Sequence, residues 1–77
     1  MASKMELDIR VVPPPEKHST IFHTFDGLAA GDGFTLINDH DPFPLRRQFE
    51  ARNPGAFKWT YLEQGPAVWR ILIEKSS

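Results

Sequence analysis

The segment FTLINDHDPFPLRRQFE, residues 34–50, contains a strand-like run, a polar junction and a helix-like run. Residues 34–38 are mostly apolar, which is typical of a strand in the middle of a sheet. The prolines within residues 42–44 favour a helix that begins there, with Asp41 as the predicted N-cap. The junction between strand and helix consists of three consecutive titratable residues, Asp39, His40 and Asp41. This junction is the first candidate for a functional site.

Further strand-like and helix-like runs flank this segment. Residues 5–12 alternate apolar and charged side chains, which predicts a strand, and three prolines then end it. Residues 15–28 carry an apolar stripe at helical spacing and predict a helix. Residues 57–62 and 68–73 predict two further strands, joined by a hairpin turn at EQGP, residues 63–66. The predicted order is therefore β-α-β-α-β-β.

This order predicts an α/β (α+β) two-layer sandwich, in which a four-stranded mixed sheet carries both helices on one face. The chain of 77 residues is long enough for one small domain, which we expect over residues 5–74. Residues 1–4 are predicted to be a disordered N-terminus or a cloning remnant. Residues 75–77 are predicted to be a C-terminal tail.

Connection rules place both helix starts at one edge of this sheet. A strand-helix-strand unit that joins neighbouring strands is right-handed and makes the two strands parallel. The carboxyl ends of the first two strands then lie at the same edge, where open α/β sheets bind ligands. Both helix N-termini point there and present unpaired N–H groups. The candidate site at this edge consists of Arg10, Glu16, Lys17, His18, Asp39, His40, Asp41 and Arg46.

The composition excludes several classes of function. Nine basic and ten acidic residues give a formal charge of -1, so neither nucleic acid nor an anionic membrane is an expected partner. Because the chain has no cysteine, it has no disulfide, no thiolate metal site and no cysteine nucleophile. No run has the apolar core of a signal peptide or the length of a membrane span, so we expect a cytoplasmic protein.

The two histidines of the candidate site have two interpretations. Imidazole is the commonest neutral metal ligand, so His18 and His40 with the neighbouring acids predict a site for zinc or iron. The alternative is structural, because His18 shares a helical stripe with Phe22 and Phe25 and would pack at the edge of the core. The spacing of the histidines matches no known metal motif, so the sequence leaves both interpretations open.

The charged residues of the candidate site also have ordinary structural roles. Aspartates cap helices and form turns, and Arg10 would pair with Asp39 or Asp41. Arg46 at a helix start runs against the helix dipole, which favours an anion or an acidic partner nearby. The simpler alternative is an ion pair of Arg46 with a neighbouring acid: Asp39, Asp41 or Glu50.

Neither the aromatic residues nor the hydroxyl groups of the chain indicate a reaction. Three aromatic residues of the hairpin, Trp59, Tyr61 and Trp69, could stack on a ring ligand or dock a partner. Cross-strand aromatic pairing explains them more simply. Ser19 and Thr20 directly follow His18 in a helix, which is a poor geometry for a nucleophile and its base. We therefore expect a protein without enzymatic activity.

Three motifs together resemble a bacterial family of uncharacterised domains, the DUF numbered 2249. They are LDIRVVPPPEKH from Leu7, NDHDPFPLRRQFE from Asn38 and WTYLEQGPAVWRI from Trp59. The family is similar in turn to the TusA/SirA sulfur carriers, which share the β-α-β-α-β-β fold. In those carriers a cysteine at the start of the first helix carries persulfide sulfur. The aligned residue here is Pro14, so the resemblance implies the fold but not the sulfur chemistry.

The resemblance implies a small non-enzymatic module that binds a ligand or a partner. Its binding edge would be formed by the loops PPPEKH, residues 13–18, and NDHDPFP, residues 38–44, with a metal or a redox partner bound there. The occurrence of family members beside hemerythrin-like domains implies a protein partner, of the hemerythrin-like or another redox type. The alternative is an accessory protein of a sulfur relay or redox pathway, without thiol chemistry of its own.

Overall fold

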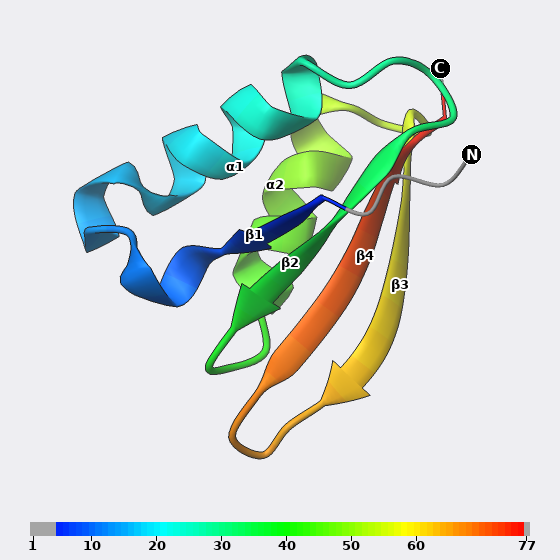
Figure 1. Ribbon diagram of the computed structural model, residues 1–77. Coiled ribbons are helices and arrows are strands. Elements are labelled where there is room, and N and C mark those ends of the chain that lie inside the picture. Colours follow the sequence, from blue (N-terminus) through cyan, green and yellow to red (C-terminus); the bar gives the residue numbers. More distant parts are fainter. Residues whose placement is uncertain (1–4, 77) are drawn as a thin grey trace.

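The computed structural model of the protein describes residues 5–76 (Figure 1). Residues 1–4, predicted to be a disordered N-terminus or a remnant, lie outside the described residues, as does Ser77. The helices and strands are β1 (Glu6–Asp8), α1 (Lys17–Asp26), β2 (Gly33–Asn38), α2 (Phe43–Arg52), β3 (Phe57–Gln64) and β4 (Trp69–Lys75). Two short 3-10 helices, η1 (Ile9–Val11) and η2 (Pro14–Glu16), connect β1 to α1. Within residues 5–76, no helix has the length and apolar character needed to cross a membrane.

The strands form one mixed sheet in the order β1-β2-β4-β3. β1 pairs with β2 in parallel, whereas β4 pairs with both β2 and β3 in antiparallel fashion. Both helices lie on the same face of this sheet (Figure 1). The predicted α+β architecture, a four-stranded mixed sheet with two helices, is therefore confirmed, and so is the parallel arrangement of the first two strands.

β1 is shorter than the predicted strand of residues 5–12, and that part of the prediction is wrong. After Asp8 the chain turns into η1, where the Asp8 carboxylate accepts a hydrogen bond of 3.1 Å from the backbone N–H of Arg10. A local bond of this kind offers the backbone an alternative to the sheet. The turn buries Ile9, which is 1% exposed, and leaves Val11 80% exposed. In a continued strand these two side chains would lie on the same face.

The core lies between the sheet and the two helices, and Phe49 of α2 is a central residue of it. Its side chain is 0% exposed. The centroid of its ring lies 4.7 Å from that of Phe22, 5.1 Å from that of Phe25 and 5.4 Å from that of Phe57. The ring of Trp59 follows at 6.0 Å. Phe49 therefore connects both helices to β3, which is an edge strand of the sheet.

Lys75 joins the end of β4 to the end of α1. Its ammonium group donates hydrogen bonds to the carbonyl oxygens of Asp26 (3.2 Å) and Leu28 (3.0 Å) and lies over the ring of Phe25. A cation near a helix C-terminus satisfies carbonyl groups that have no partner within the helix. Lys75 is thus part of the sheet and not of the predicted tail, and α1 ends two residues before the predicted Leu28.

The β3-β4 hairpin is longer than predicted. β3 continues to Gln64 and β4 begins at Trp69, so the turn lies between them and not at residues 63–66. The N–H of Gly65 donates a hydrogen bond of 2.8 Å to the carbonyl oxygen of Val68. Gly65 has a φ of 68°, in the left-handed region that favours glycine.

Both ends of the described chain lie at one end of the sheet (Figure 1). Glu6 of β1 pairs with Thr35 near the start of β2, and Glu74 of β4 pairs with Gly33 at that start. β2 then runs away from this end of the sheet and finishes at Asn38. The junction between β2 and α2 therefore lies at the opposite end of the sheet from the chain ends.

Candidate functional site

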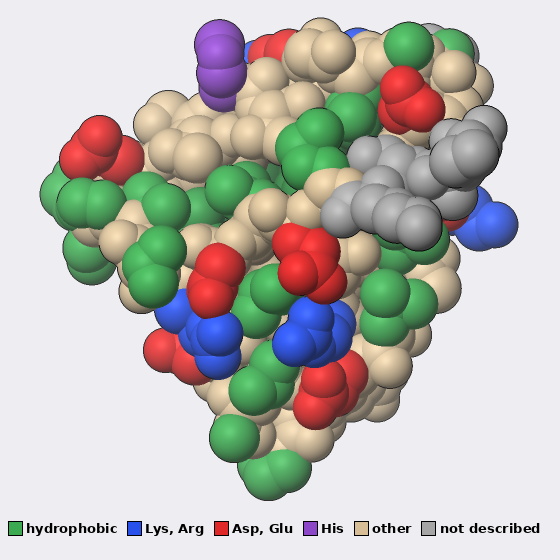
Figure 2. All heavy atoms as spheres, in the orientation of Figure 1, with side chains coloured by type: hydrophobic (Ala, Val, Ile, Leu, Met, Phe, Trp, Pro, Cys, Tyr) green, Lys and Arg blue, Asp and Glu red, His purple; other side chains and the backbone are tan. Residues whose placement is uncertain are grey.

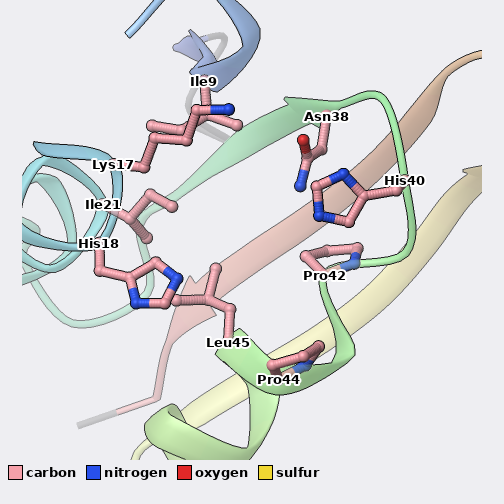
Figure 3. Close-up of a pocket in the computed structure, with 9 residues that line it drawn as sticks. All are labelled: Ile9, Lys17, His18, Ile21, Asn38, His40, Pro42, Pro44 and Leu45. Carbon is pink, nitrogen blue, oxygen red and sulfur yellow. The ribbon is translucent and has the colours of Figure 1, made fainter. Parts of the chain in front are cut away.

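A pocket of about 140 Å³ lies between the first turn of α1 and the junction that joins β2 to α2 (Figure 3). It stands where the parallel strands β1 and β2 end. The residues that line it are Ile9, Lys17, His18, Ile21, Asn38, His40, Pro42, Pro44 and Leu45. Side chains from both predicted loops therefore meet in one cavity.

The structure divides the predicted site residues into two groups. Those that line the pocket are Lys17, His18 and His40. Those that do not line it are Arg10, Glu16, Asp39, Asp41 and Arg46. None of the pocket-lining residues is a carboxylate, whereas all three acids of the predicted site are in the second group.

Asn38 begins the predicted binding loop of residues 38–44 and lines the pocket, but it was not among the individual site residues predicted from the sequence. Asn38 is 7% exposed, and it is the one polar residue that is buried among the described residues. Its side-chain oxygen Oδ1 accepts a hydrogen bond of 2.9 Å from the backbone N–H of Asp39. Its amide nitrogen Nδ2 is turned toward the cavity (Figure 3), and no residue of the described chain accepts a hydrogen bond from it. The signal in the sequence was a polar residue that directly ends an apolar strand.

His40 is held by the carboxylate beside it. The Nδ1 atom of His40 lies 2.6 Å from the Oδ1 atom of Asp39. This hydrogen bond is the main reason why the pKa of the Asp39 carboxyl is lower than its ordinary value, while partial desolvation acts in the opposite direction. Because Nδ1 is engaged by Asp39, the other ring nitrogen, Nε2, faces the pocket (Figure 3).

Asp41 does not cap α2, so the predicted N-cap is wrong. The cap position is occupied by Pro42, without a side-chain hydrogen bond. A capping side chain accepts from an N–H of the second or third helical residue, and Pro44, the second residue of α2, has none. Asp41 Oδ1 instead accepts a hydrogen bond of 2.8 Å from the hydroxyl of Tyr61. Burial and then this hydrogen bond raise the pKa of the Tyr61 hydroxyl above its ordinary value.

The sequence predicted that Arg10 would pair with Asp39 or Asp41, and this prediction is wrong. Arg10 pairs with Asp8. Its Nε and second terminal nitrogen lie 2.9 and 2.8 Å from the two carboxylate oxygens of Asp8. The turn of η1, in which the Asp8 side chain also accepts from the backbone N–H of Arg10, brings the guanidinium onto both oxygens of this carboxylate.

Ion pairs also cover the face of the sheet that the helices leave open. There Arg70 lies 3.4 Å from Glu6 and 3.1 Å from Glu63. Figure 2 shows basic side chains next to acidic ones on this side of the molecule. Opposite charges are thus paired along this face, and the paired carboxylates make it a poor surface for binding an anion.

We expect the Asp8 carboxyl to titrate with a pKa of about 2, well below its ordinary value of 3.8, mainly because of the hydrogen bond from Arg10. Since this pKa is lower in the folded chain than in the unfolded chain, the ionised carboxylate stabilises the fold at about pH 4 and above. The contribution is lost as the pH falls through about 2. The chemical shift of the Asp8 carboxyl carbon, followed by NMR during acidification, measures the pKa. Arg10→Gln should raise it toward 3.8, and an unchanged midpoint would contradict this account.

Arg46 and the aromatic residues of the hairpin take the simpler of their predicted roles. Arg46 Nε lies 3.9 Å from a carboxylate oxygen of Glu50, one of its three predicted partners. The ring of Tyr61 lies 6.3 Å from that of Trp59 on the same strand. It lies 6.2 Å from that of Trp69 on the neighbouring strand. These rings pack against the core and against one another.

The histidines predicted as metal ligands line the same pocket, but the structure adds no third ligand to them. His18 is exposed at the start of α1, and His40 projects from the β2-α2 junction. Within residues 5–76 no group of three or more histidines and acids is arranged to hold a metal ion. Zinc or iron binding at this edge stays a prediction from the sequence.

A comparison with family models identifies the relatives of the chain. Residues 6–75 match the family described as "Uncharacterized conserved protein (DUF2249)", and this range contains every strand, both helices and all pocket residues. No curated protein and no solved structure matches the chain. The fold and the pocket described above therefore belong to a member of the DUF2249 family of uncharacterized conserved proteins.

Proposed function

We propose that this protein is a non-enzymatic module that binds a small ligand in the pocket between α1 and the β2-α2 junction. The observation that carries the proposal is the side chain of Asn38, a residue only 7% exposed whose amide nitrogen is open to the pocket and has no hydrogen-bond partner in the described chain. Most polar groups of buried residues in proteins have a hydrogen-bond partner, so this donor is a ready contact for a molecule that enters the pocket. A bound ligand would supply the missing acceptor.

The size and lining of the pocket fit a small ligand. A water molecule takes up roughly 30 Å³ in the liquid, so a cavity of about 140 Å³ accommodates more than one water. Ile9, Ile21 and Leu45 form apolar walls and are at most 3% exposed. Ligand sites in proteins typically combine such walls with a few polar groups that fix the orientation of the ligand.

The side chains near the pocket favour binding over catalysis. The hydroxyl of Ser19 donates a hydrogen bond of 3.1 Å to the carbonyl oxygen of Glu16, so it is occupied by the helix backbone. The chain has no cysteine. Among the described residues that line the pocket with His18 and His40, none carries a hydroxyl or a thiol that an imidazole would activate as a nucleophile.

The other functions predicted from the sequence have less support. Sulfur relay would need a thiol from another protein, because the residue aligned with the carrier cysteine is Pro14, which is exposed in η2. A metal would have His18 and His40 as its protein ligands, without a third ligand from the described residues. A hemerythrin-like or other redox partner, a TusA/SirA-like ancestry, a bacterial source and a cytoplasmic location stay predictions.

Ligand binding is tested by NMR titration of the isotope-labelled protein with small fragments of one shape: isobutyrate, isobutyramide and isobutylammonium. We expect at least one of them to give saturable shifts of amide signals around the pocket, at His18, Ile21, Asn38 and Leu45. His18→Trp should reduce these shifts, because a larger side chain would fill the mouth of the pocket.

His23→Trp is the matched control, since His23 is an exposed residue of the same helix that does not line the pocket. It should leave the shifts unchanged. Shifts that are absent for all three fragments, or that persist in His18→Trp, would overturn the proposed function. Zinc chloride, added in a separate titration, tests the metal prediction independently.

A further inference from the structure

We propose that the ligand of this pocket carries an anionic group, such as a carboxylate, on a small apolar body. This inference rests on the proposed function and adds the chemical class of the ligand. The polar residues of the lining are Lys17, His18, Asn38 and His40. Lys17 and the amide nitrogen of Asn38 are donors, and no carboxylate lines the cavity. His40 donates from Nδ1 to Asp39, so the Nε2 atom that faces the cavity is an acceptor in the neutral ring and a donor in the protonated ring. The polar lining is therefore complementary to an acceptor with negative charge.

The orientation of the Asn38 amide is fixed by its other hydrogen bond. Its Oδ1 atom accepts from the backbone N–H of Asp39 at 2.9 Å. Exchanging the oxygen and nitrogen of this side chain would bring two donors together, so Nδ2 must be the atom that faces the cavity. The two N–H groups of Asn38 are thus directed into the pocket, where an acceptor on a ligand would replace water as their partner.

The carboxylates nearest the pocket are engaged with other groups. Asp39 binds His40 at 2.6 Å, Asp41 binds the Tyr61 hydroxyl at 2.8 Å, and Asp8 binds Arg10 at 2.8 Å. Glu16 precedes Lys17 but is exposed and does not line the cavity. No carboxylate lines the cavity, so an anion in it would meet the ammonium group of Lys17, whose charge also acts on the Asp39 carboxylate outside the lining.

The apolar part of the lining explains why the ligand would be more than an inorganic anion. Pro42, which directly precedes α2, and Pro44 in its first turn form one wall of the pocket, and neither has an N–H to donate. The start of α2 therefore adds little hydrogen bonding, and an ion held only by backbone groups at this helix end is not favoured. Ile21 and Leu45, 2% and 3% exposed, instead offer contact to a hydrocarbon group.

The affinities of the three matched fragments test the charge of the ligand. Isobutyrate should bind at least about tenfold more tightly than isobutyramide, because hydrogen bonds to an ionised acceptor are roughly twice as strong as neutral ones. Isobutylammonium should not bind in the pocket. Equal affinity for the acid and the amide would overturn the anionic ligand while leaving the proposed function intact. If none of the three binds, the proposed function fails first.

Two substitutions test the residues named. Asn38→Asp keeps the acceptor for the N–H of Asp39 but replaces the inward donor by an acceptor, so isobutyrate affinity should fall at least about tenfold. Lys17→Met removes the ammonium at a position outside the core and should also weaken binding severalfold. Lys58→Met, at an exposed site in β3, is the control and should bind as the parent does. If Asn38→Asp fails to fold, Lys17→Met alone tests the inference. An isobutyrate affinity in Lys17→Met equal to that of the parent would contradict it.

Discussion

Replacement of Phe49 by alanine is expected to cost about 3–5 kcal/mol of folding free energy. The side chain is fully buried and contacts rings from α1 and β3, so its removal would open a cavity between three elements. At roughly 0.05–0.15 kcal/mol per residue, a domain of this length has on the order of 4–12 kcal/mol of stability in total. The substitution would therefore remove a large share of it. Urea denaturation followed by tryptophan fluorescence gives the two free energies of unfolding.

Phe43→Ala is the matched control, because Phe43 is the same residue type on the same helix but is 49% exposed. It lies next to Arg47, whose guanidinium is 5.8 Å from the ring centroid. Loss of such an exposed contact should cost at most about 1 kcal/mol. A cost for Phe43→Ala equal to that for Phe49→Ala would show that the arrangement of α2 on the sheet is not the one described.

Replacement of Gly65 by alanine should have the next largest effect, about 2–5 kcal/mol. Gly65 has a φ of 68°, a conformation that costs an L-residue with a Cβ roughly 1–2 kcal/mol. The added Cβ would also lie only 2.7 Å from the indole nitrogen of Trp69, so the ring or the turn would have to move. Overpacking of this kind typically costs a further 1–3 kcal/mol. Thermal unfolding of parent and variant measures the sum.

Gly55 separates the two contributions to this effect. Its φ of 72° is close to that of Gly65, but a Cβ there would have no neighbour within 4 Å. Gly55→Ala should therefore lose only the conformational part, about 1–2 kcal/mol. The difference between the two alanine variants then reports the contact with Trp69. If both variants lose the same stability, the indole is not packed against Gly65 as described.

The order of elements was predictable from the sequence because it depends on patterns that extend over several residues. The spacing of Phe22 and Phe25, the apolar run of β2 and the prolines before α2 each indicate one element without regard to the others. The parallel pairing of β1 and β2 then follows from the right-handedness of the crossover. The predicted order of elements and the predicted pairing stay the same when the ends of an element are misplaced by a few residues.

The end of β1 was not predictable in the same way. Alternation over residues 5–12 satisfies a strand, and the competing feature is a single hydrogen bond from the Arg10 backbone to the Asp8 side chain. Whether the chain forms this local bond or continues as a strand depends on the neighbouring strand β2, which pairs with only three residues of β1. A sequence contains the residues of both alternatives but not their relative free energies.

The candidate site was predictable as a place but not as a set of contacts. The edge where the two loops meet could be inferred, and Lys17, His18 and His40 do line its pocket. The partners of the charged residues could not, since they depend on local geometry that only the folded chain defines. Asn38 was not predicted as an individual site residue for the same reason, because its burial and the direction of its amide are properties of the fold.

The location of both chain ends has a practical consequence for work with this protein. They lie at the end of the sheet where β2 begins, and the pocket lies at the end where β2 finishes. A dye attached close to Glu6 or Glu74 would therefore sit at the opposite end of the sheet from the pocket. The same holds for a second domain joined there by a short linker, which would leave the pocket accessible from solution.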